Sequence, residues 1–243
     1  MSGHSKWSTI KRQKGANDAK RGQAFTKLSM AITMAVRQGG GIADPESNFK
    51  LRLAIDAARN VNMPKDTMNR AIARALGKAE KEMTEVVYEG FGPGGFSVIL
   101  EAITDNKQRT TLEIKSLFDK HGGTLGVPGS VSYQFKHTGQ IAVKKEDKSL
   151  DEIFLLAVED GAEDVEDSDE EVFIFTSAET LKKVSGALEG HGLEISSSEL
   201  TYRPIVNKVM QVDMQAQKAI TFLEMLEEHA DVQRVYANVE ISV

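Results

Sequence analysis

Hydrophobic residues near the start of the chain recur at the spacing of one helical face. The segment QAFTKLSMAITMAVRQ places Phe25, Leu28, Ile32 and Ala35 on one stripe. The three glycines at 39–41 then interrupt the pattern. This spacing predicts a first helix that ends at the glycines.

Two further helices are predicted after the glycines. The second has Asp44 as its expected N-cap and Pro45 at its first position, with apolar residues about every four positions after that. Pro64 ends this pattern, and Asp66 offers a cap for a third helix that ends at Gly77. Basic residues recur on the third helix, roughly opposite its apolar stripe: Arg70, Arg74 and Lys78. The pattern therefore predicts a small helical bundle with a basic outer face.

In the middle of the chain the spacing changes to the period of strands. Residues 85–103 predict two strands around a glycine-rich turn at 90–95. A helix follows, with Asp105 as its expected cap and Gln108 in the capping-box position. The segment GSVSYQF at 129–135 is then predicted to be a strand.

Residues 139–206 add a strand, a helix, a strand, a helix and a strand, in that order. The rest of the chain adds one helix and one strand, VQRVYANVEI at 232–241. A lone helix and strand cannot form a sheet, so we expect them to complete the sheet left unfinished at Phe135.

The predicted fold class is therefore α+β, with an N-terminal helical bundle followed by two α/β sandwich domains, the last inserted into the middle one. The predicted units are a basic arm at 1–22, a helical domain at 23–82, a discontinuous α/β domain at 83–136 plus 205–243, and an inserted acidic ferredoxin-like domain at 137–204.

Charge is distributed unevenly along the chain. Residues 1–82 contain 16 of the 30 Lys and Arg residues and 7 of the 36 Asp and Glu residues, so they carry +9 and the remainder carries −15. Such opposite halves favour one end that binds a polyanion. The arm is too polar to bury enough apolar surface to offset its ordering entropy, so we expect it to order on a partner.

The chain contains no cysteine, which excludes disulfides, thiol nucleophiles and Cys-based zinc sites and favours a cytoplasmic location. No apolar run reaches the roughly 18 residues of a membrane span. The informative residues begin at Gly3, so we expect no targeting segment and no membrane partner.

The sequence lacks the complete motifs that are typical of catalytic and metal sites. The glycine-rich turn lacks the GK[ST] ending of a phosphate-binding loop and does not open a helix. The acidic run at 159–171 lacks the spacing of an EF-hand, so a solvated turn is predicted there. The five histidines show no paired metal spacing. We therefore expect no enzyme activity, no catalytic residue, no metal site and no cofactor.

Lysines and arginines of the arm suit nucleic acid, because they displace condensed counterions from phosphates. Trp7, the one tryptophan, has two open interpretations: stacking on an unpaired base, or packing on the helical bundle as an anchor. The predicted nucleic-acid-binding residues are Lys6, Trp7, Lys11, Arg12, Lys14, Lys20, Arg21, Lys27, Arg70, Arg74 and Lys78.

Motifs along the whole chain resemble the YebC/PmpR family. They are GHSKW at 3–7, IKRQK at 10–14, FTKL at 25–28, MPKDTMNRAI at 63–72, YEGFGPGG at 88–95, TDNKQRT at 104–110 and GGTLGVPGSVSYQF at 122–135. The resemblance implies a three-domain, non-enzymatic cytoplasmic protein with a helical domain and two α/β domains. Members are described as DNA-binding transcriptional regulators and as translational activators on the ribosome, so both levels of control stay open.

The leading hypothesis is a non-enzymatic regulator of gene expression that binds DNA or ribosomal RNA through the arm and the helical domain, with the ribosome as a candidate partner. Residues 49–76 resemble a helix-turn-helix, but Pro64 and the short third helix argue against groove reading. A flexible basic arm also suits folded RNA. The alternative from another class is an interaction module that docks on an acidic protein. A monomer is favoured.

Overall fold

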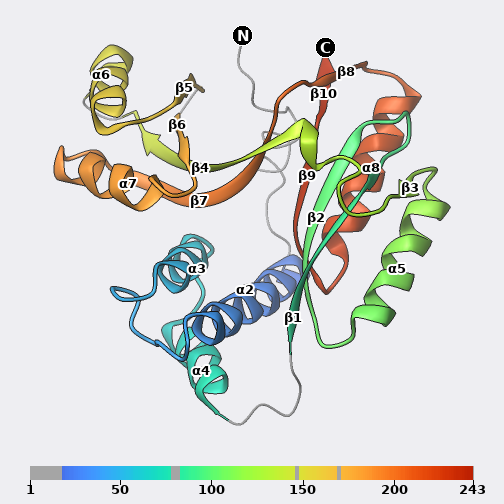
Figure 1. The fold of residues 1–243 in the computed structure, drawn as a ribbon, viewed down its shortest axis with the longest axis horizontal. Coiled ribbons are helices and arrows are strands. Elements are labelled where there is room, and N and C mark those ends of the chain that lie inside the picture. The colour runs from blue at the N-terminus through green and yellow to red at the C-terminus, as the bar shows by residue number, and fades with distance from the viewer. Residues whose placement is uncertain (1–17, 78–82, 146–147, 169–170, 243) are drawn as a thin grey trace.

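The computed structural model describes residues 18–77, 83–145, 148–168 and 171–242, and it confirms the α+β class. A group of helices at the N-terminal end lies beside two four-stranded sheets and one two-stranded sheet (Figure 1). Within the described ranges, no helix combines the length and the apolar character needed to cross a membrane.

The helical domain consists of α2 (Asp18–Gln38), α3 (Phe49–Asn60) and α4 (Lys65–Leu76). Both α3 and α4 pack on α2, which gives the group its centre. Thr33 of α2 donates a hydrogen bond to the carbonyl oxygen of Ala71 on α4 at 3.1 Å. Their common core contains Ile32, Val36, Leu51, Ile55, Ala58, Met63 and Met68.

The N-cap of α3 is Asn48, and the prediction of Asp44 is wrong. The Asn48 side chain accepts a hydrogen bond from the Leu51 N–H at 3.1 Å, and its amide donates to the carbonyls of Ala35 and Ile42. Asp44 instead accepts two hydrogen bonds within the preceding turn. An amide that both accepts and donates can join the helix start to the end of α2, which a carboxylate cannot do.

The caps predicted for two later helices are also wrong. Pro64 occupies the N-cap position of α4, and Asp66 lies in the first turn without a side-chain cap. In α5 (Lys107–Lys120) the cap is Asn106 rather than Asp105, and its side chain accepts from the backbone N–H three residues later at 3.0 Å. The Asp105 carboxylate joins an ion pair instead. Of these two adjacent residues, Asn106 thus caps the helix and Asp105 forms the ion pair.

The first sheet is antiparallel and mixes two distant parts of the chain. Its strands are β1 (Thr84–Phe91), β2 (Ser97–Thr104), β3 (Thr124–Leu125) and β9 (Val232–Ala237), in the order β3-β1-β2-β9. Helices α5 and α8 (Met214–Glu228) pack on it. The core between them contains Phe96, Leu100, Ile114, Phe118, Phe222, Leu223 and Val235.

The second sheet comes from one continuous part of the chain. Its antiparallel strands are β4 (Phe135–Lys144), β5 (Asp164–Asp167), β6 (Glu171–Ser177) and β7 (Ile195–Pro204), in the order β5-β6-β4-β7. Two helices pack on it, α6 (Leu150–Asp160) and α7 (Leu181–Gly190).

Part of the acidic run predicted as a solvated turn is the edge strand β5. Four of its residues pair with β6, and basic side chains from other segments offset its charge. Arg203 pairs with Asp164 at 2.6 Å and also with Glu166. Such distant partners cannot be read from the local pattern.

The segment predicted as a strand at 129–135 is mostly a loop that ends in a single 3-10 turn, η1 (Ser132–Gln134). A buried carboxylate from β1, that of Glu89, satisfies the backbone of this loop instead of a neighbouring strand. It accepts hydrogen bonds at 2.8 Å from the N–H groups of Gly129, Val131 and Ser132.

The last predicted strand is divided in two at Asn238. Its first part is β9, and its second part, β10 (Val239–Ser242), pairs in parallel with β8 (Lys208–Gln211), a strand that the sequence pattern missed. The Asn238 side chain accepts from the Ser97 N–H at 2.7 Å and donates to the Val206 carbonyl at 3.2 Å. These bonds replace strand pairing at the break.

Candidate nucleic-acid interface

Much of the predicted binding arm falls where the structure gives no description. Lys6, Trp7, Lys11, Arg12, Lys14 and Lys78 lie outside the described residues, as does the side chain of Lys20. The structure therefore places only Arg21, Lys27, Arg70 and Arg74 among the predicted residues.

Helix α4 presents two of these arginines to solvent. Met68 and Ala71 are buried against α2, and Arg70 and Arg74 project from the exposed side of the helix. The Arg70 guanidinium bonds back to its own first turn, to the Asp66 carbonyl at 3.3 Å and to a threonine hydroxyl at 3.1 Å. Within the described ranges, neither arginine pairs with a carboxylate.

Lys65 is also exposed, at the first position of α4. The sequence interpretation missed it because it stands outside the four-residue repeat of the other cations. Lys65, Arg70 and Arg74 together are called the α4 basic face below. Three cations without a carboxylate partner among the described residues leave their charge available to a phosphate.

Helix α3 differs from α4 because its cations have local partners. Arg59 pairs with Asp56 at 3.1 Å, Arg52 pairs with Glu46, and the Lys50 ammonium donates to Gln38 at 2.7 Å. Residues 18–77 contain 10 Lys and Arg residues against 5 Asp and Glu residues, and the paired groups lie mainly on α3. The net positive charge is therefore concentrated away from α3.

The predicted residues do not meet in one patch. Arg21 is exposed in the first turns of α2, 12 residues before the Thr33 position where α4 crosses, which corresponds to about 18 Å along the helix axis. Lys27 contacts a different part of the molecule, because its ammonium donates to the carbonyl of Glu227 in the last turn of α8. A cation is favourable at that end of a helix, so the structure gives Lys27 an internal contact.

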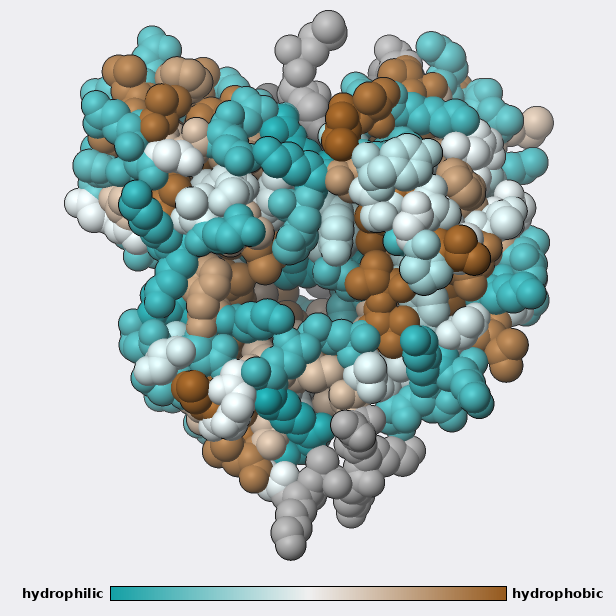
Figure 2. Space-filling model, in the orientation of Figure 1, coloured by the Kyte–Doolittle hydropathy of each residue, from teal (hydrophilic) through white to brown (hydrophobic). Residues whose placement is uncertain are grey.

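Lys27 also lines a cleft of about 450 Å³ between the helical domain and the sheets. Figure 2 shows this part of the molecule as a hollow between the lower and upper lobes. Its walls are largely small and apolar, with Ala24, Leu28, Ala31, Ala54, Val86 and Ile103 among them. The cleft lies between the helical domain and the sheets, and most of the side chains that line it are apolar rather than chemically reactive.

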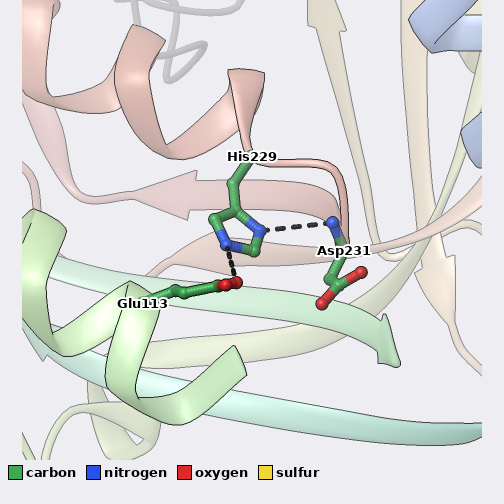
Figure 3. Close-up of side chains that lie close together, drawn as sticks. All are labelled: Glu113, His229 and Asp231. Carbon is green, nitrogen blue, oxygen red and sulfur yellow. Dashed lines mark hydrogen bonds and ion pairs between the residues drawn. The ribbon is translucent and has the colours of Figure 1, made fainter. Parts of the chain in front are cut away.

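One cluster outside the helical domain has the composition of a metal site. Ligand atoms of Glu113, His229 and Asp231 lie within 4.8 Å of one another (Figure 3). The His229 Nε2 lies 3.1 Å from the Glu113 carboxylate, and its Nδ1 accepts from the Asp231 backbone N–H at 3.2 Å. Both ring nitrogens are thus already engaged.

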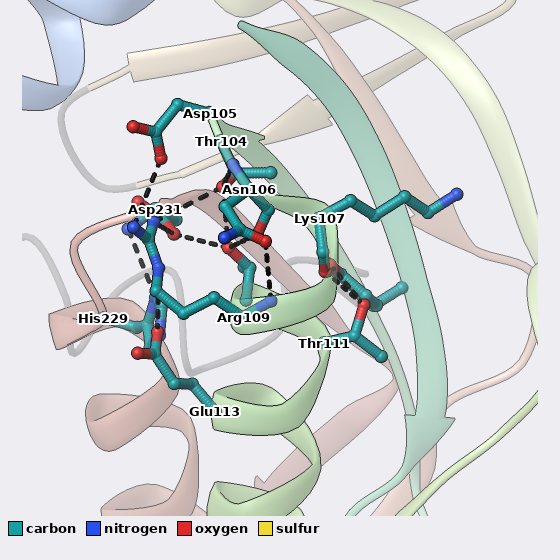
Figure 4. Close-up of polar contacts among 11 residues, drawn as sticks. Thr104, Asp105, Asn106, Lys107, Arg109, Thr111, Glu113, His229 and Asp231 are labelled. Carbon is teal, nitrogen blue, oxygen red and sulfur yellow. Dashed lines mark hydrogen bonds and ion pairs between the residues drawn. The ribbon is translucent and has the colours of Figure 1, made fainter.

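The guanidinium of an arginine supplies the positive charge in this cluster that a metal ion would otherwise supply. The Arg109 guanidinium donates to Asp231 at 2.7 Å, lies 3.8 Å from the Glu113 carboxylate and pairs with Asp105 at 3.2 Å (Figure 4). A metal ion would have to displace a permanently charged group from its partners. The cluster is therefore better described as an ion-pair network than as a metal centre.

The network fixes the start of α5 to the turn before β9. Asp231 is 8% exposed and also accepts from the Thr110 hydroxyl at 2.6 Å, and the Thr110 oxygen lies 2.7 Å from the Thr104 hydroxyl. Burial raises the pKa of Asp231, but the hydrogen bonds from Thr110 and Arg109 outweigh it and hold that pKa below its usual value. The TDNKQRT segment thus helps to hold β9 in the first sheet.

Comparison with known proteins assigns both ends of the chain to one family. Residues 5–78 match the model of the TACO1/YebC protein N-terminal domain, and residues 83–239 match that of the TACO1/YebC second and third domain. Similar curated proteins include one of Acidithiobacillus ferrooxidans, 49% identical over 243 residues, and one of Persephonella marina, 46% identical over 244. Each is named "Probable transcriptional regulatory protein".

These alignments cover 100% of this chain and 96% and 97% of the two relatives. A crystal structure of a conserved hypothetical protein from Aquifex aeolicus is also similar, with 43% identity and a TM-score of 0.87 over 98% of both chains. Sequence and fold agree over the full length, and the chain belongs to the TACO1/YebC family.

Proposed function

We propose that the protein is a non-enzymatic regulator of gene expression that binds the phosphates of a nucleic acid. The observation that carries this proposal is the α4 basic face, whose cations have no carboxylate partner among the described residues, next to an α3 whose cations are paired. The names of the relatives, as probable transcriptional regulatory proteins, support a regulatory role without catalysis.

Phosphate contact is favoured over reading of bases. In a helix-turn-helix protein the recognition helix lies in the major groove on a rigid support. Here α4 has 12 residues and packs chiefly on α2, and its contact with α3 is small. Arg21 lies about 18 Å along α2 from the α4 crossing. Cations at separate places suit an extended phosphate surface.

Folded RNA is our preferred target, with ribosomal RNA as the specific expectation. An arm rich in Lys and Arg contacts irregular RNA without a fixed groove spacing. Duplex DNA is the second candidate, because the relatives are named as transcriptional regulators. A duplex reader should lose about 1 to 3 kcal/mol per mismatched base pair, whereas phosphate binding should tolerate sequence. Protein that stays with ribosomes in a gradient-separated lysate at low salt supports the RNA target, and recovery at one promoter sequence alone contradicts it.

The α4 basic face is tested by Arg70→Glu combined with Arg74→Glu. Binding to a ribosomal RNA fragment and to duplex DNA is measured over a range of salt concentrations. Each lost phosphate contact should weaken binding to all sequences and reduce the salt slope by about 1.

The matched control is Arg59→Glu, because Arg59 is also exposed but already pairs with Asp56 on α3. The control should change the slope less than the double variant. Equal slopes in the double variant and the unaltered protein would remove α4 from the interface.

We also propose that residues 137–204 form a domain inserted into a discontinuous one at 83–136 plus 205–243. The support is the strand order: β9, which follows the second sheet in the chain, pairs with β2, which precedes it. The second sheet draws all four strands from residues 135–204. The acidic residues of this domain would then face away from phosphates or meet protein partners.

A further inference from the structure

Helix α6 carries apolar residues on two opposite sides. Ile153 and Ala157 are completely buried in the core that α6 shares with α7 and the second sheet. On the outward side Phe154, Leu155 and Val158 are 48%, 63% and 51% exposed. A surface helix normally buries one apolar stripe and turns polar residues to solvent. Apolar residues that gather on the exposed side as well are typical of a surface that binds a partner.

The outward residues of α6 form two neighbouring ridges, because residues four apart lie one above the other on a helix. The first ridge is apolar throughout and contains Leu150, Phe154 and Val158. The second ridge has an acid at each end and contains Asp151, Leu155 and Glu159. The two acids are eight residues apart, which corresponds to about 12 Å along the helix axis. These six residues are called the outer α6 face below.

The two acids of the outer α6 face have no ion-pair partner among the described residues. Asp151 and Glu159 are both exposed. The other acids of the helix are engaged, since Glu152 forms a capping box with Ser149 and Asp160 lies 3.5 Å from the ring of His191. The sequence of α6 contains no Lys or Arg. The charge of the outer face is therefore available to cations of another molecule.

The chemistry of this face favours a basic protein as its partner. Two carboxylates without cations beside them repel the phosphates of a nucleic acid and the headgroups of an anionic lipid. A partner that fits needs an apolar stripe for the first ridge and cations for the acids of the second. An amphipathic helix has both when Lys or Arg residues two turns apart flank its apolar stripe.

A second copy of this chain fits the outer α6 face less well through its own basic helix. The outward side of α4 presents Arg70 and Arg74, but Met68 and Ala71 are buried against α2. Leu76, at the end of the helix, is the one large apolar residue that α4 exposes. Helix α4 thus offers cations without an apolar stripe beside them.

The outer α6 face is remote from the α4 basic face. Helix α6 lies at the outer end of the second sheet, away from the helical domain (Figure 1). Hydrophobic and hydrophilic residues lie side by side on the lobe that contains it (Figure 2). A protein bound at α6 therefore leaves the α4 basic face uncovered.

We propose that the outer α6 face is a docking surface for a basic amphipathic helix of a partner protein. The ridge of Leu150, Phe154 and Val158 packs into a groove of that helix, and Asp151 and Glu159 pair with its cations. This inference goes beyond the proposed function, because it adds a protein partner at a separate surface. It holds whichever nucleic acid the N-terminal part binds.

The probe is a labelled peptide of about 18 residues, long enough to form a helix, with leucines on one stripe and lysines beside it. A second peptide has Glu in place of each Lys. Binding to the full chain is measured by fluorescence anisotropy. Phe154→Gln with Val158→Gln should weaken binding of the Lys peptide about tenfold. Asp151→Lys with Glu159→Lys should weaken it similarly and should make the Glu peptide the tighter ligand. All four positions are exposed, so the core stays intact.

The matched controls make the same kinds of change elsewhere on the surface. Asp119→Lys with Glu189→Lys alters the net charge equally on α5 and α7, and Leu112→Gln removes an exposed leucine from α5. Both controls should keep the affinity for the Lys peptide within about twofold. Equal weakening by the control charge pair would show that net charge alone attracts the peptide. Failure of the Lys peptide to bind the unaltered protein also overturns the proposal.

Sedimentation of the full chain over a range of concentrations tests the other occupant, a second copy. The proposal predicts that the unaltered protein and the variant with Phe154→Gln and Val158→Gln sediment alike. A dimer of the unaltered protein that this variant fails to form would show that a second copy covers the outer α6 face, and it would overturn the proposal.

Discussion

Glu89 shows how much one side chain can order in this fold. Its carboxylate is 8% exposed and accepts three backbone hydrogen bonds from the loop before β4. Burial raises the pKa of Glu89, but the N–H groups of the loop outweigh burial and hold that pKa below its usual value. The loop geometry therefore depends on an ionised group.

Glu89→Gln should destabilise the protein by about 1 to 3 kcal/mol at neutral pH. The NH2 group of the glutamine would face backbone N–H groups, and it cannot accept hydrogen bonds from them. The carboxylate contribution is present above the unfolded-state pKa of about 4.3 and is lost as the pH falls through the lower folded-state pKa. Urea unfolding of the protein and the variant should therefore converge as the solution is acidified below that range. Glu85→Gln, at an exposed position of the same strand, is the control. A constant difference at all pH values would show that the ionised carboxylate is not the cause.

At the scale of elements, the sequence pattern predicts the helices whose apolar residues recur at a regular spacing. It misses features that depend on a single polar contact, such as the residue that caps a helix. The helices at 107–120 and 214–228 follow from apolar spacing, and so does α2 from residue 23 onward, whereas residues 18–22 of α2 were assigned to the arm. The starts of α3 and α5 do not follow from this spacing, because an Asn and an Asp stand close together near each of them and only the packed structure selects one. Strand β8 was missed because four residues give too short a pattern, and β5 because its residues are mostly acidic.

The site was predictable to the same degree. The exposure of Arg70 and Arg74 follows from their place opposite the apolar stripe of α4. The contact of Lys27 with Glu227 joins residues 200 positions apart, so no local spacing could reveal it. The local charge pattern therefore identifies α4 as a basic helix. Tertiary contacts decide which of the other predicted cations are available to bind a phosphate.

Asn48 carries the sharpest prediction about an element. Asn48→Asp keeps the oxygen that caps the Leu51 N–H but removes the amide that donates to the Ala35 and Ile42 carbonyls. The Ile42 carbonyl then loses the bond from Asn48, and the Ala35 carbonyl keeps only the bond from the Gly39 N–H, so the cost should be about 1 to 3 kcal/mol in urea unfolding. Asp44→Asn, in the exposed turn before α3, should cost far less. Equal stability of Asn48→Asp and the unaltered protein would confine the role of Asn48 to capping.

At the scale of the whole molecule, the strand order predicts which parts fold alone. A fragment of residues 137–204 contains nearly all of the second sheet with α6 and α7, and it should unfold in one cooperative transition. A fragment of residues 83–136 lacks β9 and α8, which supply much of the first core, and it should fold poorly. Calorimetry of the two fragments tests this. A sharp transition in the 83–136 fragment would contradict the inserted-domain arrangement.

The proposed function concerns the whole molecule too, because it assigns phosphate binding to the N-terminal part of an acidic chain. Residues 1–82 carry +9 within a total of −6. The sequence predicts an arm too polar to join a core, so reversal of its charge should leave the melting temperature nearly unchanged.

The most direct measurement is the salt dependence of nucleic-acid binding by the full chain and by a variant with Lys11→Glu, Arg12→Glu and Lys14→Glu. With roughly five phosphates neutralised, a plot of log affinity against log salt should have a slope of about −4.5 on duplex DNA and about −3.5 on single strands. The triple variant should lose most of that slope and keep its melting temperature. An unchanged slope in the triple variant would contradict phosphate binding by the arm.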